Sequence, residues 1–331
     1  MGRIPWKPAS RYSKGGDMVK IPKLGMTPVT HLDSGFEYPG RDVLRVPAIP
    51  QDTANLPVTL DYALSIRKWP TYGNIKAGTC TLASLAHLIM AWTKRSRGRA
   101  LRIRPKLVMD AYKTLTGYTP GQPDTDTGLD PLVAMDYFRT DGFGKHLIVG
   151  YGGSAVGTRG LDPLHLWYHD AWLMEDGKCG TIELFKDYIY RFGGIQLSLQ
   201  LPVVTQTMLR DRAVWDIDVD YPEDGEADFW TPVPLTGNLE PNSWGGHCVA
   251  AVGYTPYKQL IIVSWGKLYF VSHRFLAAYM IYAYVPWCPQ HWTYFDDGPP
   301  RFNEETMANM MNMCDAEPNG IEAFLKWERP A

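Results

Sequence analysis

The sequence contains no apolar run long enough to cross a membrane. Its longest apolar stretch begins at Ala277, reads AAYMIYAYVPW and already includes a proline, whereas about 18 apolar residues are needed to span a bilayer. The N-terminal residues MGRIPWKPASRYSKGG are basic, but they lack the apolar segment of a secretory signal. We therefore expect a cytoplasmic protein without a membrane partner.

Cysteine is scarce and shows no pairing pattern. The 331 residues include five cysteines, namely Cys80, Cys179, Cys248, Cys288 and Cys314. An odd number at wide spacing argues against a disulfide scaffold, and the lack of any CxxC pair argues against a zinc site. We expect unpaired thiols in a reducing compartment, and neither a metal nor a cofactor.

Neither sign of charge dominates. Lys and Arg number 33 and Asp and Glu 35, for a formal net charge of −2. Proteins that coat nucleic acid normally carry a strong basic excess, so a nucleic-acid partner is not expected. Hydrophobic residues make up 45% and charged residues 21%, which is ordinary globular usage and excludes wholesale disorder.

Changes in composition divide the chain into three parts. Residues 1–55 are rich in proline and glycine without periodicity, which predicts an extended N-terminal arm. Residues 56–286 have the composition of a folded domain. Residues 287–331 predict an irregular C-terminal extension with one short Met-rich helix, NEETMANMMNMC. Arms at both ends suit a protein that binds protein partners through them.

Within residues 56–286, helical patterns precede strand patterns. The segment CTLASLAHLIMAW from Cys80 has apolar residues at helical spacing, with Thr79 as a suitable N-cap. Further helices are expected from Pro105 and Asp130. The later segments IQLSLQLPVV, HCVAAVGY and QLIIVSWG are typical of strands. The sequence therefore predicts an α+β fold with a helical lobe and a strand-rich lobe.

Two residues in this domain have features of a thiol catalytic pair. Cys80 is expected at the start of a helix, where unpaired N–H groups and the macrodipole favour a thiolate. His247 enters an apolar strand after two glycines, GGHCVAAVGY, and a thiolate nucleophile needs such a base. Each residue alone would more often be an ordinary buried core position.

Three segments in this order resemble the papain-like cysteine peptidase superfamily. They are NIKAGTC (Asn74–Cys80), GGHCVAAVGY and VSWG (Val263–Gly266). LPVTLDY, from Leu56, also matches the start of mature domains in that family. The resemblance covers Leu56 to Pro286 and implies a helical left lobe with the cysteine, a β-rich right lobe with the histidine, and a cleft between them.

The resemblance also implies roles for individual residues. Cys80 would be the nucleophile and His247 its general base and later acid. The Cys80 backbone N–H and the Asn74 side chain would form the oxyanion hole, where the family normally has Gln. The implied substrate is a peptide or protein.

The sequence departs from the family at the residue that orients the histidine. The family has Asn in an NSWG motif, and Val263 takes that place here. Valine cannot accept the imidazole N–H, so Ser264, a backbone carbonyl or water would have to substitute. Residues 1–55 are also too few for the long helical propeptide of lysosomal-type zymogens, so activation by removal of such a segment is not expected.

Two hypotheses of different classes follow. The first is a papain-like cysteine hydrolase, a peptidase or amidase with a Cys–His dyad, from which acyl transfer on the same dyad is not separated. The alternative is a catalytically weak or inactive papain-fold structural or binding protein. The chain looks similar to papain-like proteins of tailed bacteriophages, so this alternative includes a virion component assembled through its terminal arms.

Overall fold

The structure, a computed structural model, describes residues 21–26, 56–63, 65–144, 146–148, 150–157, 171–174, 179–209, 213–216 and 238–288. Most of the predicted N-terminal arm and nearly all of the C-terminal extension, including its Met-rich helix, lie outside these residues. In the described part, no helix is both long and apolar enough to cross a membrane.

The longest helix of the described chain, α1 (Cys80–Arg97), begins at the predicted cysteine. It runs beyond the predicted apolar segment into the basic residues Lys94, Arg95 and Arg97, which suit the negative end of its dipole. Gly98 ends it in the left-handed conformation, with φ of 67°. Thr79 takes the N-cap position, as expected, but its side chain forms no capping hydrogen bond. Its hydroxyl donates instead to the Tyr72 carbonyl (3.0 Å).

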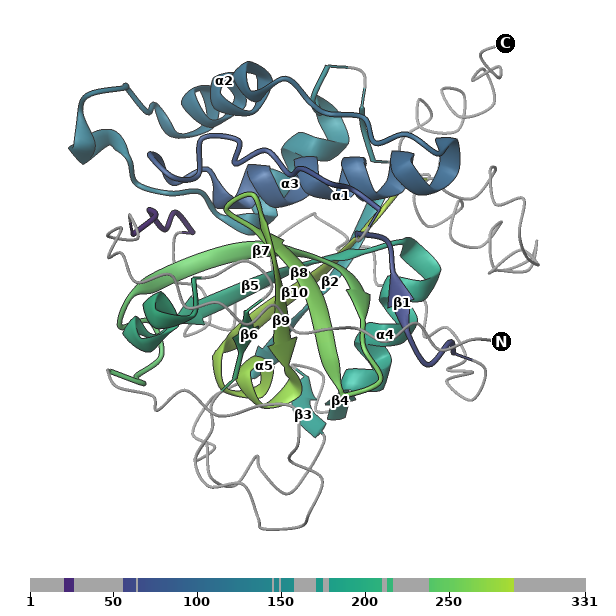
Figure 1. The fold of residues 1–331 in the computed structure, drawn as a ribbon. Helices are drawn as coiled ribbons and strands as arrows, with labels where there is room; N and C mark the ends of the chain where they lie inside the picture. The colour runs from purple at the N-terminus through teal and green to yellow at the C-terminus, as the bar shows by residue number, and fades with distance from the viewer. Residues whose placement is uncertain are drawn as a thin grey trace, which may run out of the picture.

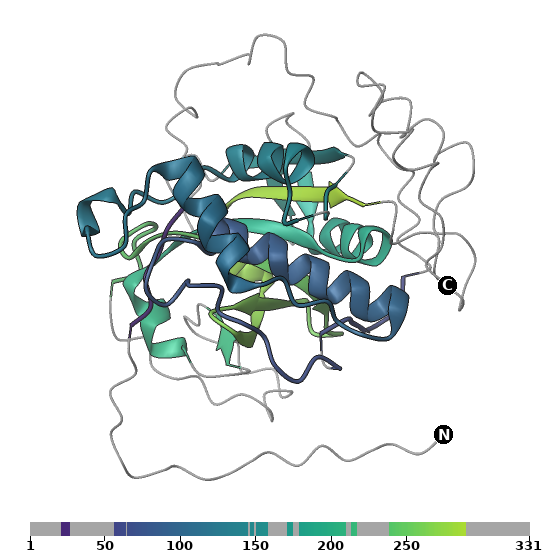
Figure 2. The same cartoon turned by 90° about the horizontal axis from the view of Figure 1, so that it is seen from above.

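Two further predicted helices are present, α2 (Pro105–Thr116) and α3 (Pro131–Thr140). Both have proline in the first turn, where its missing N–H costs no hydrogen bond. The Asp130 side chain caps α3 by accepting from the Leu132 N–H (2.7 Å). Figure 1 shows α1, α2 and α3 gathered on one side of the strands, and α1 lies across the strands when seen from above (Figure 2).

The described strands form one continuous sheet in the order β4-β3-β2-β10-β5-β7-β8-β9-β6, with β1 also paired to β7. All pairings are antiparallel except that of β6 with β9. The strands are β1 (Leu60–Asp61), β2 (Gly150–Gly157), β3 (Ala171–Met174), β4 (Cys179–Thr181), β5 (Ile195–Leu201), β6 (Val214–Trp215), β7 (Gly245–Tyr254), β8 (Gln259–Ser264), β9 (Lys267–Ser272) and β10 (Met280–Trp287).

The strand β7 separates two cores because its side chains alternate between the faces of the sheet. Cys248, Ala250 and Val252 pack in the core that contains α1. Val249 and Ala251 pack in the opposite core. That second core also contains side chains of α4 (Ile182–Phe192) and α5 (His273–Tyr279). The helices therefore cover both faces of the sheet near its centre, and the predicted α+β class is confirmed.

The elements that were not predicted from the sequence include α4, α5, β2, β3, β4, β9 and β10. The buried residues of α4, Ile182, Phe185, Ile189 and Phe192, recur at helical spacing, so that signal was present. In contrast, β10 lies between two other strands, β2 and β5, and is apolar on both faces. Such a run has no alternation by which a strand is recognised. It also ends at Trp287, one residue beyond the predicted domain boundary.

Candidate active site

Cys80 is the first residue of α1 and lies where that helix meets the sheet. Gln196 on β5 ties the first turn of α1 to the sheet by donating to the Thr81 carbonyl (2.9 Å) and the Ser84 hydroxyl (2.6 Å). Cys80 is 1% exposed. Because N–H groups at a helix start have no partner within the helix, this position favours a thiolate and a developing oxyanion next to it.

His247 lies on β7 and is held from two sides. Its Nε2 is 2.6 Å from the Ser264 hydroxyl at the end of β8. Its ring stacks on Trp265, with centroids 4.2 Å apart and an interplanar angle of 16°. Trp265 reaches this position through a left-handed backbone, with φ of 46°, followed by Gly266 with φ of 76°. The imidazole is therefore fixed in both position and plane.

His247 also interacts with the thiol of Cys80. Its Nδ1 is buried and has no hydrogen bond of ordinary geometry within the described residues. Burial raises the pKa of the Cys80 thiol, but hydrogen bonds with Cys248 and His247 and the charge of His247 outweigh it. The pKa of Cys80 consequently lies well below its usual value, which favours the thiolate.

The orienting residue of the histidine is Ser264 rather than its neighbour Val263. Val263 pairs with Ala250 across β7 and β8 and packs in the core that contains α1. Ser264, one residue later, has the hydroxyl that contacts Nε2. A serine hydroxyl can accept the imidazole N–H, so the structure selects one of the three substitutes that the sequence left open.

Asn74 lies in the loop before Cys80, and its side-chain amide is engaged within that loop. It is buried, and its Nδ2 donates to the Ala77 carbonyl in its own loop (3.4 Å). The donor is therefore present in the loop before Cys80, as the sequence predicted, but engaged. Its role in an oxyanion hole stays a prediction that requires the amide to turn.

A segment from the N-terminal arm crosses the site. The Met26 N–H donates to the Gly246 carbonyl (3.1 Å), next to His247, and the Leu129 N–H donates to the Gly25 carbonyl (2.8 Å). Gly25 also lies so close to Gly78, two residues before Cys80, that a Cβ on Gly25 would be 1.9 Å from the Gly78 Cα. We call residues 21–26 the strap, because they bridge the histidine side and the cysteine side of the site.

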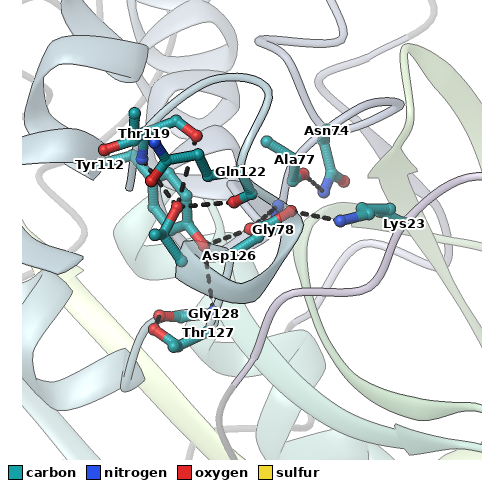
Figure 3. Close-up of polar contacts among 11 residues, drawn as sticks. Lys23, Asn74, Ala77, Gly78, Tyr112, Thr119, Gln122, Asp126, Thr127 and Gly128 are labelled. Carbon is teal, nitrogen blue, oxygen red and sulfur yellow. Dashed lines mark hydrogen bonds and ion pairs between the residues drawn. The ribbon is translucent and has the colours of Figure 1, made fainter. Parts of the chain in front are cut away.

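A buried carboxylate fastens the strap (Figure 3). Asp126 accepts from the Lys23 ammonium (2.7 Å), the Tyr112 hydroxyl (2.7 Å) and the Gly78 N–H (2.9 Å). The Tyr112 oxygen in turn accepts from the Gly128 N–H (3.0 Å). Burial raises the pKa of Asp126, but Lys23, Tyr112 and Gly78 outweigh it and hold the pKa below its usual value. Asp126 thus joins the strap to the loop before Cys80.

Several of these residues were not found from the sequence. Lys23 and Asp126 are 103 positions apart, and the backbone contacts of Met26 leave no side-chain pattern. Cys248 follows directly after the predicted His247, so its position beside the site was a signal that could have been used. In the described part of the chain, no cluster of three or more potential ligands is arranged to hold a metal ion.

The comparisons with known proteins concern the fold. No family model matches the sequence, and no curated protein matches it. Among solved structures, xylellain, a cysteine protease from Xylella fastidiosa, is similar with 10% identity and a TM-score of 0.47, over 81% of this chain and 96% of that one.

Two further solved structures are similar over most of the chain. The digestive procathepsin L 3 of Tenebrio molitor has 13% identity and a TM-score of 0.44, covering 74% of each chain. A stem bromelain precursor has 12% identity and a TM-score of 0.40, covering 72% of this chain and 73% of that one. The TM-scores of all three solved structures are below 0.5, so the likeness is divergent.

Proposed function

We propose that this chain is a papain-like cysteine hydrolase that cleaves peptide or amide bonds, with Cys80 as nucleophile and His247 as general base and acid. One observation carries the proposal: a buried thiol of lowered pKa contacts an imidazole whose far nitrogen is held by Ser264. The unpaired state of Cys80 and Cys248 supports action in a reducing compartment such as the cytoplasm.

The proposed reaction proceeds by acyl transfer to sulfur. The Cys80 thiolate attacks the carbonyl carbon, and the oxyanion is stabilised by the N–H groups at the start of α1 and by Asn74 once its amide turns from Ala77. His247 then gives the Nδ1 proton to the leaving amine, and an acyl-enzyme remains. His247 next removes a proton from water, which attacks the acyl group and regenerates the thiol.

The strap implies that the proposed hydrolase is not constitutively active. Residues 21–26 pair with Gly246 and Leu129 on either side of the dyad, so they occupy the space that a substrate backbone requires. The proposed hydrolase is therefore latent while the strap is in place. Here an extended segment covers the site, so the long helical propeptide considered from the sequence is not required for latency.

The same covering favours the alternative function, a papain-fold binding protein whose dyad does no chemistry. In its most specific form this is a virion component that assembles through residues 1–55 and 287–331. The proline- and glycine-rich composition of the first of these segments supports it. Under this alternative the strap is a permanent part of the fold.

Thiol titration decides between the two functions. We would alkylate Cys80 with iodoacetamide across a pH series, in the parent protein and in His247→Gln, and quantify each cysteine by peptide mass spectrometry. The hydrolase predicts that Cys80 labelling, even where the strap slows it, sets in at a pH well below the ordinary thiol pKa of about 8.5, and that this low onset is lost in the variant. Labelling that begins only near that pH in both proteins would reject the hydrolase.

A positive titration leads to a product assay. A peptide mixture is incubated with the parent and with Cys80→Ser, with and without an added primary amine, and new termini are identified by mass spectrometry. Hydrolysis gives free carboxylates, whereas acyl transfer to the amine gives amides. Cys80→Ser is the matched control because it keeps the size of the side chain but lacks a nucleophile that His247 can hold as an anion.

A further inference from the structure

Cys248 lies beside the proposed nucleophile, and the mechanism above does not use it. Cys80 begins α1, and Cys248 is on the face of β7 that packs against that helix. The two thiols interact with each other. Both are almost fully buried, with 1% and 2% exposure. Two thiols in contact between a helix start and a central strand form a pair rather than two isolated cysteines.

Polar neighbours orient the second thiol. The Ser198 hydroxyl, directly across the β5–β7 pairing, is 3.4 Å from the Cys248 sulfur. The Thr81 hydroxyl is 3.9 Å from the Cys80 sulfur and also interacts with Cys248. A cysteine that served only as a small apolar residue would need neither contact. These hydroxyls hold Cys248 toward Cys80 rather than deeper in the apolar core.

The two thiols differ in acidity, which suits a nucleophilic and a resolving role. The pKa of Cys80 is held well below its usual value despite its burial, chiefly by Cys248 and His247. Burial and then the hydrogen bond with Cys80 raise the pKa of Cys248 well above its usual value. Oxidation by peroxides begins at the more acidic, thiolate-forming sulfur, so Cys80 reacts first and a thiol remains next to it.

We propose that Cys80 and Cys248 form a reversible disulfide under oxidation by hydroperoxides, and that this bond removes the nucleophile from the active site. The disulfide is a modification of the two thiols and stands without the proposed hydrolase. The consequence for activity rests on the proposed function.

The reaction balances with a hydroperoxide as the oxidant. The Cys80 thiolate attacks one peroxide oxygen, the O–O bond breaks, and a sulfenic acid forms as hydroxide leaves and takes up a proton. The Cys248 thiol then loses its proton, its sulfur attacks the Cys80 sulfur, and the hydroxyl leaves as water. The two thiols give up two electrons, and hydrogen peroxide becomes two waters. A dithiol reductant reverses the bond by exchange.

The experiment treats the full-length folded protein with hydrogen peroxide, blocks remaining thiols under denaturing conditions, and maps peptides by mass spectrometry without reduction. The expected result is a Cys80–Cys248 cross-linked peptide, two hydrogens lighter than its parts. Iodoacetamide labelling of Cys80 is lost at the same time and returns with dithiothreitol. Lys23→Ala, which loosens the strap, is treated in parallel, because an intact strap that excludes peroxide would prevent the disulfide from forming.

Cys248→Ser tests the resolving role, with Cys288→Ser as the matched control. In Cys248→Ser, Cys80 is expected to proceed to sulfinic and sulfonic acids, so labelling no longer returns with dithiothreitol. Cys288→Ser keeps the reversible bond. Overoxidised Cys80 beside a reduced Cys248, or no cross-link in either the parent or Lys23→Ala, would overturn the proposal.

The outcome for the disulfide is separable from that for the hydrolase. A reversible cross-link in a protein that cleaves no peptide, even with the strap loosened by Lys23→Ala, supports the disulfide and rejects the hydrolase. Peptide cleavage by a protein that forms no cross-link supports the hydrolase and rejects the disulfide. If both hold, cleavage falls with the fraction of cross-linked protein and recovers with it on reduction.

Discussion

The ion pair between Lys23 and Asp126 tests whether the strap closes the site. Lys23→Ala removes the strap's one side-chain contact with this carboxylate (2.7 Å), while Asp126 keeps the Tyr112 hydroxyl and the Gly78 N–H as donors. The substitution therefore weakens the attachment of the strap without leaving the buried carboxylate bare. The backbone hydrogen bonds of Gly25 and Met26 remain.

The exposure of the pair sets the size of the effect. The Lys23 side chain is 46% exposed and that of Asp126 is 2% exposed. Water screens the lysine, so the pair belongs at the upper end of surface ion pairs, about 1 kcal/mol. Since 1.4 kcal/mol corresponds to a tenfold change in an equilibrium constant, the open population should rise about fivefold.

Alkylation of Cys80 by iodoacetamide measures that population, because the reagent reaches the thiol only when the strap has left. Lys23→Ala should react about fivefold faster than the parent. High salt should accelerate the parent and leave the variant almost unchanged, because salt weakens an ion pair whose lysine is half exposed. Lys106→Ala is the matched control, since it breaks an exposed ion pair with Asp110 on α2.

Acid should release the strap by the same route. Because the pKa of Asp126 lies below its usual value in the folded protein, its contribution is complete above the ordinary pKa, about 3.9. Its contribution to holding the strap is lost as the pH falls through the lowered value.

Equal alkylation rates in the parent, Lys23→Ala and Lys106→Ala, at low and high salt, would show that the strap does not control access to Cys80.

Three further outcomes are expected. Ser264→Ala should lower the rate of Cys80 alkylation near neutral pH and reduce any kcat about tenfold, through the loss of a hydrogen bond worth about 1.4 kcal/mol; an unmoved pH profile would contradict the orienting role. His247→Gln should move the onset of Cys80 alkylation up to pH 8.5 or above, about the value of an unassisted thiol, and unchanged labelling at pH 6 would refute the pair. Gly25→Ala should displace the strap, because its Cβ would lie 1.9 Å from Gly78; protection of the Met26 N–H from hydrogen exchange equal to that of the parent would show otherwise.

The sequence was sufficient to predict the elements that carry the dyad. The apolar stripe after Cys80 determines both α1 and its burial, and the apolar segment after His247 gives β7. Local periodicity carries this information, so it can be read without an alignment. The order of helices and strands then predicted the α+β class, which the structure confirms.

The orienting contact could not be chosen from the sequence, because it depends on which strand face each residue occupies. The pairing of β7 with β8 places Val263 opposite Ala250, so Val263 lies in the core with α1, together with Cys248 and Ala250. Successive residues of a strand point to opposite faces, and Ser264 becomes the partner of His247. A motif comparison that places residues by position alone does not include these faces.

The strap could not be predicted from the sequence because most of its contacts are made by backbone groups. Met26 and Gly246 meet across 220 positions through one N–H and one carbonyl, and any residue except proline offers the same N–H. The composition of residues 1–55 predicted an extended arm. It contained no information about the surface on which that chain would lie.

The hydrogen bond between Met26 and Gly246 means that a peptide bound beside His247 would meet a competitor from the same molecule. A tethered segment acts at an effective concentration of about millimolar for short flexible connections. The apparent affinity of any external peptide is reduced by the fraction of molecules in which the cleft is free. If the chain were cut between the strap and Leu56, the strap would no longer be tethered, and its concentration at the site would fall on dilution. Dilution alone would then raise the occupancy of the site by other peptides.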